Sequence, residues 1–159
     1  ELSISICFLP IFFSESQDIV IPIGSNSNNH HTITATINGQ TCCLVVDTGA
    51  SHTCLDIMAV TDTLQLIVSN MEHSQVIGLG NVEGKLSLTF IESITLGEQL
   101  HLTQRSLPVI DLGVVRQVFW ETNQIIIHGI LGADFLSECN ALISYENSCL
   151  YLLQPNIAD

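Results

Sequence analysis

Positive charge is scarce in this sequence. Lys and Arg together number 3, against 16 Asp and Glu, so the formal net charge at pH 7 is -13. A protein with so few cations cannot neutralise many phosphate groups, which excludes nucleic-acid binding and disfavours anionic membrane surfaces. Long apolar runs are missing too, because no stretch reaches the roughly 18 residues typical of a membrane-spanning helix. We therefore expect neither a nucleic acid nor a membrane as a partner.

Charged residues of either sign make up only 12% of the chain, whereas 47% of its residues are apolar. Such a composition excludes intrinsic disorder, because too much apolar surface requires burial. The 159 residues suffice for one hydrophobic core, and neither an internal repeat nor a linker divides them. We expect a single globular domain over residues 17–159, preceded by a separate apolar segment over residues 1–16.

The apolar N-terminal segment has two interpretations. Residues 2–13 are almost entirely apolar and are followed by Ser14-Glu15-Ser16, an arrangement typical of the back part of a secretory signal peptide. Neither an initiator Met nor a basic region precedes them, and Ile and Ser alternate over residues 3–6 as they do in an edge strand. The segment is either a trimmed signal or an interface arm. The protein is therefore either cytoplasmic or, with a trimmed signal, exported.

Paired metal-binding cysteines are also missing. Six cysteines are present, and none forms a C-x-x-C pair: Cys7, Cys42, Cys43, Cys54, Cys139 and Cys149. Neighbouring side chains on a strand point to opposite faces, so Cys42 and Cys43 are poorly placed to bind one metal ion. We expect mostly buried, free thiols and neither a metal nor an organic cofactor. One or two disulfides remain an alternative if the chain is exported.

Short apolar runs separated by turn residues dominate the rest of the chain. Asn38-Gly39 predicts a tight hairpin between two strands. The span 113–123 has no clear period and is expected to be a loop with a helical turn, whereas residues 133–139 predict a short helix. Many short strands indicate an all-β barrel or sandwich. The expected strands cover residues 19–23, 32–37, 41–46, 85–91, 94–96, 100–103, 125–131, 141–145 and 149–153.

The motif most suggestive of chemistry is Asp47-Thr48-Gly49-Ala50-Ser51, directly after an apolar strand. Burying a carboxylate there costs several kcal/mol unless it is hydrogen-bonded or has a function. Gly49 lets the backbone turn sharply, and Thr48 places a hydroxyl beside the acid. We expect a carboxylate held on a rigid loop in a confined place. Taken alone, the motif is explained equally well by an ordinary Asx turn.

A second corner follows at Gly129–Leu131, where an apolar strand leads through Gly132 and Ala133 into the short helix. Together the two motifs resemble the retropepsin-like aspartic proteases, the single-lobe relatives of pepsin that include retroviral, retrotransposon and bacterial enzymes. The residues around Gly132 look most like the bacterial branch, in which export would lead to the periplasm or cell envelope. The resemblance covers residues 30–153. It implies a closed all-β barrel of short strands with a flap hairpin and one or two short helices, functioning as a dimer.

The resemblance also assigns roles to residues. It implies that Asp47 is the catalytic aspartate, that Thr48 ties the two active-site loops together across the dimer, and that Gly49 lines the cleft. The flap corresponds best to residues 76–84, although their glycines also fit an ordinary turn. Residues 113–124 are an insertion near the cleft, and Ala133-Asp134 replaces an Arg of the retroviral type, which we expect to affect the interface rather than the chemistry. Candidate substrate-binding residues are Ala50, Ile77, Gly78, Leu79, Gly80 and Ile130.

Peptide hydrolysis of this type requires two carboxylates around one water molecule. The chain has one Asp-Thr-Gly motif. The most similar triplet, Asp111-Leu112-Gly113, has a leucine in place of the threonine and so lacks its hydroxyl. The second Asp47 must then come from an identical chain on a two-fold axis. The sequence thus predicts a homodimeric aspartic endopeptidase acting on a peptide or protein. The alternatives are a catalytically idle module of the same fold that dimerises or binds peptides, and a thiol protein suggested only by the cysteines.

Overall fold

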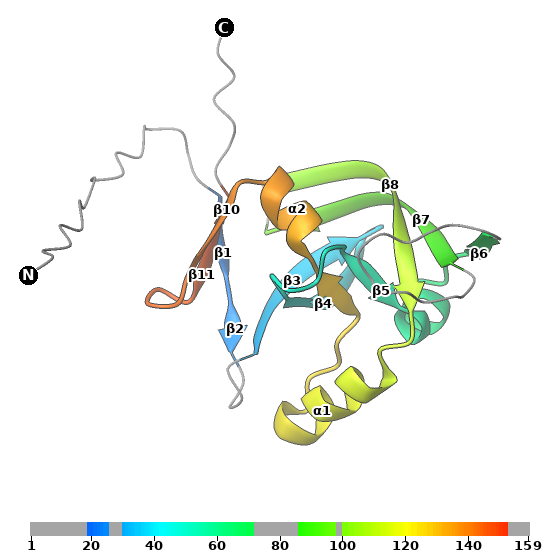
Figure 1. The fold of residues 1–159 in the computed structure, drawn as a ribbon, viewed down its shortest axis with the longest axis horizontal. Helices are drawn as coiled ribbons and strands as arrows, with labels where there is room; N and C mark the ends of the chain where they lie inside the picture. Colours follow the sequence, from blue (N-terminus) through cyan, green and yellow to red (C-terminus); the bar gives the residue numbers. More distant parts are fainter. Residues whose placement is uncertain (1–18, 26–29, 72–85, 98–99, 153–159) are drawn as a thin grey trace, which may run out of the picture.

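The computed structural model describes residues 19–25, 30–71, 86–97 and 100–152. Most of these residues form two β-sheets, the larger of which closes on itself (Figure 1). Its strands are β2 (Gly24–Ser25), β3 (His31–Ile37), β4 (Gln40–Val46), β5 (Cys54–Asp56), β6 (Val68–Met71), β7 (Leu86–Leu96), β8 (Leu100–Ile110) and β9 (Gly129–Leu131). The order β3-β4-β9-β5-β8-β7 is closed by a further pairing of β3 with β7. Six strands therefore form a closed barrel, as predicted.

The smaller sheet packs beside the barrel and is entirely antiparallel (Figure 1). It consists of β1 (Ile19–Pro22), β10 (Ala141–Ser144) and β11 (Cys149–Leu152), in the order β1-β11-β10. Ile19 and Ile21 of β1 are buried and join the main core, while the residues between them face outward. The predicted final hairpin, β10–β11, is confirmed. The interpretation of residues 1–16 remains a prediction, since those residues lie outside the described part of the chain.

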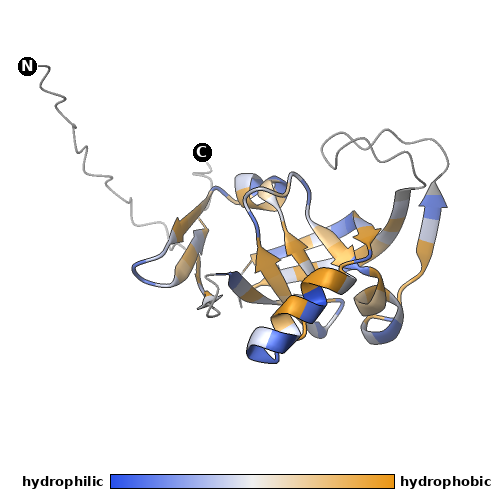
Figure 2. Cartoon of the chain, turned by 60° about the horizontal axis from the view of Figure 1, so that its bottom comes forward, coloured by the Kyte–Doolittle hydropathy of each residue, from blue (hydrophilic) through white to orange (hydrophobic). Residues whose placement is uncertain are grey.

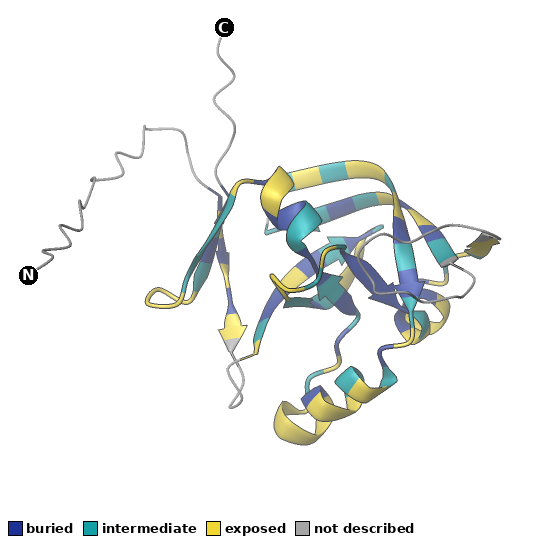
Figure 3. Ribbon diagram, in the orientation of Figure 1, coloured by how far each residue is buried: buried dark blue, intermediate teal, exposed yellow. Residues whose placement is uncertain are grey.

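The predicted hairpin between β3 and β4 is confirmed. Asn38 and Gly39 both have positive φ, at 47° and 81°, which the Asn-Gly pair accommodates with little strain. The Asn38 amide N–H donates to the Ser93 carbonyl at 3.0 Å, so the turn is fixed onto β7. Ile33 and Ile37 of β3 are buried in the main core, and Figure 3 shows buried segments on the strands of the barrel. Alternating burial along β3 therefore places one face of the hairpin in the core.

Strands β7 and β8 are longer than predicted, each running through 11 residues. The sequence predicts two strands in place of β7 because the alternation of buried and exposed residues shifts within it. Ile91 and Ile94 are both buried although they lie three residues apart. Opposite this point, Gln104 of β8 has a positive φ of 52°. The phase change hides a continuous strand from a period-two pattern. Conversely, the strand predicted over residues 125–131 is restricted to β9.

The span 113–123 is an α-helix, α1 (Gly113–Asn123), and not the expected loop. It ends at Gln124, which adopts the left-handed conformation with φ of 55°. The helical period is obscured because only Phe119 is buried, whereas Val114 and Trp120 are 80% and 53% exposed. Apolar and polar residues therefore mix around the helix (Figure 2).

The predicted short helix is confirmed as α2 (Ala133–Glu138), at the opposite side of the barrel from α1 in Figure 1. The sequence did not indicate three elements between the two motifs: β5, a π-helical turn η1 (Ala59–Thr63), and β6. No helix within the described ranges is long and apolar enough to cross a membrane. The predicted flap, residues 76–84, lies outside those ranges.

Candidate active site

Asp47 lies immediately after β4, where this strand runs parallel to β9. Val46 is the partner of Leu131 in this pairing, and the Asp47 amide N–H donates to the Leu131 carbonyl at 3.1 Å. The Asp47 Oδ1 atom accepts a hydrogen bond from the Gly49 amide N–H at 2.8 Å, and the Ala50 amide donates to the Asp47 carbonyl at 3.3 Å. The loop is therefore a tight turn that is anchored to the neighbouring strand at its first residue.

The turn presents its catalytic candidates to solvent. Asp47, Thr48 and Gly49 are all exposed, and Ala50 is half-buried. No hydrogen bond joins the Thr48 hydroxyl to another residue in the described part of the chain. The sequence predicts a confined carboxylate, but the described residues of a single chain leave Asp47 exposed. Any confinement of this carboxylate must come from groups beyond the described residues of one chain.

The second motif packs directly against the exit of the turn. The Ala133 amide N–H donates to the Ala50 carbonyl at 2.8 Å. The Gly132 amide N–H donates to the Thr53 Oγ1 atom at 2.9 Å. A Cβ atom on Gly132 would lie 2.5 Å from the His52 carbonyl carbon, so only glycine permits this approach. The two motifs that carry the family resemblance are therefore one structural unit.

Thr53 and Asp134 belong to this unit, although neither was a candidate site residue in the sequence. Thr53 is fully buried, and its amide and hydroxyl both donate to Asp134 Oδ1, at 2.8 and 2.7 Å. Asp134 lies in the first turn of α2, where a carboxylate is favoured by the helix dipole. That position is the signal in the sequence that could have identified it. Thr53 has no such signal, because a buried threonine after a turn is common.

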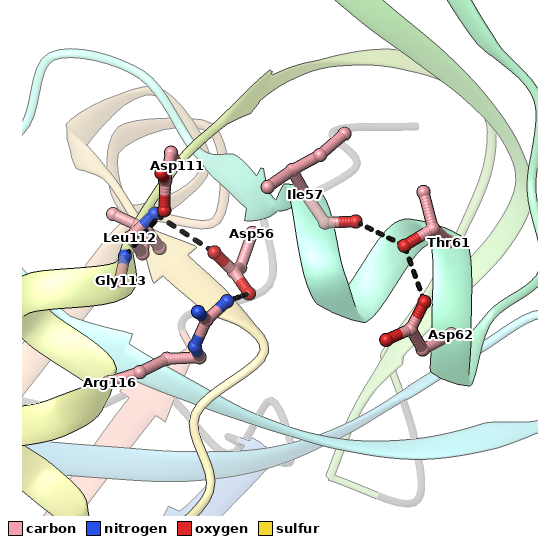
Figure 4. Close-up of polar contacts among 8 residues, drawn as sticks. All are labelled: Asp56, Ile57, Thr61, Asp62, Asp111, Leu112, Gly113 and Arg116. Atoms are coloured by element: carbon pink, nitrogen blue, oxygen red, sulfur yellow. Dashed lines mark hydrogen bonds and ion pairs between the residues drawn. The ribbon is translucent and has the colours of Figure 1, made fainter.

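A buried carboxylate, that of Asp56, connects β5 to α1 (Figure 4). Asp56 is 0% exposed; its Oδ2 atom is paired with the Arg116 guanidinium, and its Oδ1 atom accepts the Leu112 amide N–H at 2.9 Å. No local pattern in the sequence indicates this pair, since 60 residues separate its members. Arg116 is thereby held at the base of α1, which fixes where the helix begins.

Helix α1 covers the outer face of β4 and β9. Phe119 packs in a small cluster against Val45 and Ile130, so the candidate substrate-binding residue Ile130 is half-buried beneath the helix. The Phe119 ring also stacks on His30, with centroids 5.3 Å apart, and His30 precedes the residue that pairs with Val46. The helix therefore lies beside the entry to the Asp47 loop. A groove of about 440 Å³ on its outer side is lined by Gly113, Arg116, Gln117, Trp120, Ile125 and Ile126.

Other titratable groups near the loop are poorly suited to nucleophilic chemistry. Burial raises the pKa of the Cys54 thiol to about 11, and the nearby charges of Asp134, Asp56 and Asp47 add to this effect. A thiol with so high a pKa is a weak nucleophile at neutral pH. Burial lowers the pKa of His128, whose Nδ1 atom accepts the Cys43 amide N–H at 3.1 Å. Among the described residues, no three His, Cys, Asp or Glu side chains could hold a metal ion.

The predicted substrate contacts of the flap cannot be placed. Ile77, Gly78, Leu79 and Gly80 all lie outside the described residues. The structure therefore brings together Asp47, Thr48, Gly49 and Ala50 with the second motif, and places Ile130 one strand away. The roles assigned to all these residues by the resemblance remain predictions.

Comparison with known proteins supplies the family. The model of the family described as gag-polyprotein putative aspartyl protease matches residues 33–138. A retropepsin-like aspartic protease from Rickettsia conorii superimposes with a TM-score of 0.51 at 20% identity, covering 85% of this chain and 88% of that one. The retroviral protease-like domain of Ddi1 from Leishmania major gives a TM-score of 0.49 at 16% identity, covering 78% and 88%.

No curated protein sequence matches the chain. The family match nevertheless spans both motifs and the barrel strands between them. The likeness to the Rickettsia structure independently agrees with the closed barrel built from β3, β4, β5, β7, β8 and β9. The chain therefore belongs to the gag-polyprotein putative aspartyl protease family and has the retropepsin-like all-β fold.

Proposed function

We propose that this protein is an aspartic endopeptidase whose active site contains Asp47 from two identical chains. The observation that carries the proposal is the placement of Asp47: an exposed carboxylate on a tight turn, anchored through its own amide to Leu131 of the second motif. A carboxylate that served only the fold would be expected to use its oxygens on buried donors, as Asp56 does. Within the described residues, the Asp47 carboxylate instead accepts only a local bond from the Gly49 amide, and the residue is exposed.

The chemistry follows from the properties of paired carboxylates. Two carboxyl groups in close contact cannot both ionise, so the pair shares one proton, as in aspartic proteases generally. The ionised Asp47 takes a proton from water while the water oxygen adds to the scissile carbonyl carbon, and the protonated Asp47 polarises the carbonyl oxygen. Collapse of the tetrahedral intermediate breaks the C–N bond, and the carboxyl pair returns a proton to the leaving amine. No metal or organic cofactor is needed in this scheme.

The second carboxylate is proposed to come from a partner chain because the same chain offers no equivalent. Asp111 has the same local geometry as Asp47, since its Oδ1 atom accepts the Gly113 amide N–H at 2.8 Å. It leads into α1, however, and lacks a neighbouring hydroxyl. The exposure of Asp47 and Thr48 leaves both side chains available to an identical copy. The expected substrate is an extended peptide or protein segment, in contact with Ala50, Ile130 and the flap.

Substitution of Asp47 by Asn tests the proposal, with Asp111→Asn as a control of matched local geometry. A diverse peptide library is incubated with wild type and both variants across pH 3–8, and cleavage is followed by mass spectrometry. We expect Asp47→Asn to lower turnover by roughly 10²–10⁴-fold, because it removes the general acid–base pair. We expect Asp111→Asn to cleave like wild type.

Sedimentation at micromolar concentration and far-UV circular dichroism complete the test. Both variants should retain the dimer and the fold, and a statine-type transition-state analogue should inhibit the wild type. A strictly monomeric wild type, or undiminished cleavage by Asp47→Asn, would contradict the proposed dyad. Dimerisation and peptide binding without any cleavage would instead favour the idle module.

A further inference from the structure

One carboxylate oxygen of α2 helps to hold the segment that follows the Asp47 turn. Asp134 Oδ1 accepts three hydrogen bonds: from the Thr53 amide at 2.8 Å, from the Thr53 hydroxyl at 2.7 Å, and from the Phe135 amide at 2.8 Å. The Thr53 hydroxyl oxygen in turn accepts the Gly132 amide N–H at 2.9 Å. One oxygen atom therefore joins the segment after Asp47 to the first turn of α2.

This arrangement leaves Thr53 with no alternative partner for its donors. Thr53 is 0% exposed, so water cannot replace Asp134 as the acceptor for its amide or its hydroxyl. Buried donors without an acceptor cost free energy, and the segment would have to move to reach water if Asp134 were lost. Hydrogen bonds to a carboxylate are stronger than those to a neutral acceptor, so Asp134 holds Thr53 more firmly than a neutral side chain would. The segment from Ala50 to Thr53 is thus fixed at both ends, the other tie being the Ala133 amide on the Ala50 carbonyl.

We propose that Asp134 is a positioning residue for Asp47: by binding Thr53 it fixes the exit of the turn and so sets the direction in which the Asp47 carboxylate points. This inference rests on the proposed function. It differs from the expectation drawn from the sequence, in which Ala133-Asp134 acts on the interface between chains. Here the carboxylate acts within one chain, on the loop that carries the catalytic candidate.

The effect on catalysis follows from the sensitivity of reaction rates to geometry. A displacement of about 1 Å in a reacting group can lower the rate on the order of 10²-fold, even when its cause lies away from the reacting atoms. Among the described residues, only Gly49 forms a hydrogen bond with the Asp47 side chain. Its direction therefore depends on the backbone of the turn, whose exit is fixed through Thr53 and Asp134.

Two pairs of variants separate positioning from charge and from volume. Asp134→Asn keeps a carbonyl oxygen that can accept the same three hydrogen bonds, whereas Asp134→Leu keeps the volume and loses the acceptor. Thr53→Ser keeps the hydroxyl, whereas Thr53→Val removes it. We expect kcat to fall roughly 10–100-fold in Asp134→Leu and Thr53→Val, with KM changed less than about threefold. The conservative variants should restore most of the activity.

Glu138→Gln is the matched control, because Glu138 lies on the same helix but pairs with Arg105 and makes no contact with the turn. We expect its kcat to equal that of the wild type. Sedimentation and urea unfolding of each variant establish that the compared proteins are folded dimers. A loss of kcat in Asp134→Leu with full recovery in Asp134→Asn supports positioning. Equal losses in both variants, or a loss confined to KM, would overturn it.

Hydrogen–deuterium exchange gives a readout that does not depend on activity. In Asp134→Leu and Thr53→Val, the amides of residues 49–53 should exchange at least about tenfold faster than in wild type, with unchanged exchange in β7 and β8. Unchanged exchange over residues 49–53 would refute the inference. If the wild type cleaves no peptide, the proposed function fails, while this measurement still decides whether Asp134 holds the turn.

Discussion

Removing the Arg116 guanidinium tests how strongly the fold depends on its buried pair with Asp56. Asp56 is 0% exposed and Arg116 is 29% exposed at its side chain, so the carboxylate depends on this partner and on the Leu112 amide alone. The substitution Arg116→Met keeps the apolar stem and removes the charge. It therefore leaves the buried carboxyl group of Asp56 without its cationic partner and with one hydrogen-bond donor, the Leu112 amide, among the described residues.

The loss in free energy of unfolding expected for Arg116→Met lies between two limits. Loss of one partner from a fully buried ion pair costs about 3–5 kcal/mol, whereas exposed pairs contribute at most about 1 kcal/mol. Because Arg116 is partly exposed, we expect the low end of the buried range, about 3 kcal/mol. For a domain of this size that corresponds to a fall in Tm of about 6–12 °C. Arg105→Met, which removes the more exposed pair with Glu138, should cost only about 1 kcal/mol.

Urea unfolding at one fixed protein concentration measures these differences, because dimer formation would otherwise shift the apparent stability. The double variant Arg116→Met, Asp56→Asn is the decisive comparison. Its amide still accepts the Leu112 N–H but carries no charge, so we expect it to be more stable than Arg116→Met alone. A cost below about 1 kcal/mol for Arg116→Met, or a double variant less stable than that single one, would refute the reasoning.

Two further predictions concern the contacts around the turn. Gly132→Ala would place a Cβ atom 2.5 Å from the carbonyl carbon of His52. We therefore expect urea unfolding to show a free energy of unfolding lower by about 3 kcal/mol. An unchanged free energy would show that the backbone around Gly132 moves apart at little cost. Burial lowers the pKa of His128 below its ordinary value of 6.5, so the unfolded chain takes up a proton first and stability falls as pH decreases through 6.5. His128→Asn should flatten this fall between pH 7.5 and 5.5 in thermal unfolding, and an unchanged slope would contradict the assignment.

Much of the fold could be predicted because local signals agree with it. The Asn38-Gly39 turn, the alternation in β3 and the final hairpin all depend on residues close together in the sequence. Helix α1 could not be predicted, since its exposed Val114 and Trp120 blur the helical period. What fixes this helix is the pair between Arg116 and Asp56, which joins residues 60 positions apart. A pattern of neighbouring residues cannot indicate a partner so far away in the sequence.

The candidate site shows the same division. The tight turn at Asp47 was predictable because Asp-Thr-Gly directly after an apolar strand favours an Asx turn, and the structure has one. The role of Asp134 was not, since it depends on Thr53, which is 81 residues away and becomes its neighbour only in the folded barrel. The described residues leave Asp47 exposed, contrary to the confinement expected from the sequence. The local pattern indicates which groups are present, whereas their exposure depends on the surfaces packed against them.

The position of β9 has a consequence for when the candidate active site could form during synthesis. Strands β4 and β5 follow one another along the chain, yet β9 lies between them in the barrel. The barrel cannot close until β9 has been made, and Thr53 has no acceptor until residue 134 follows it. A nascent chain therefore carries Asp47 on an unsupported turn for as long as its C-terminal part remains unmade. We expect an incomplete domain to lack the proposed peptidase activity. That activity would arise in one late step, when the last strands join the barrel.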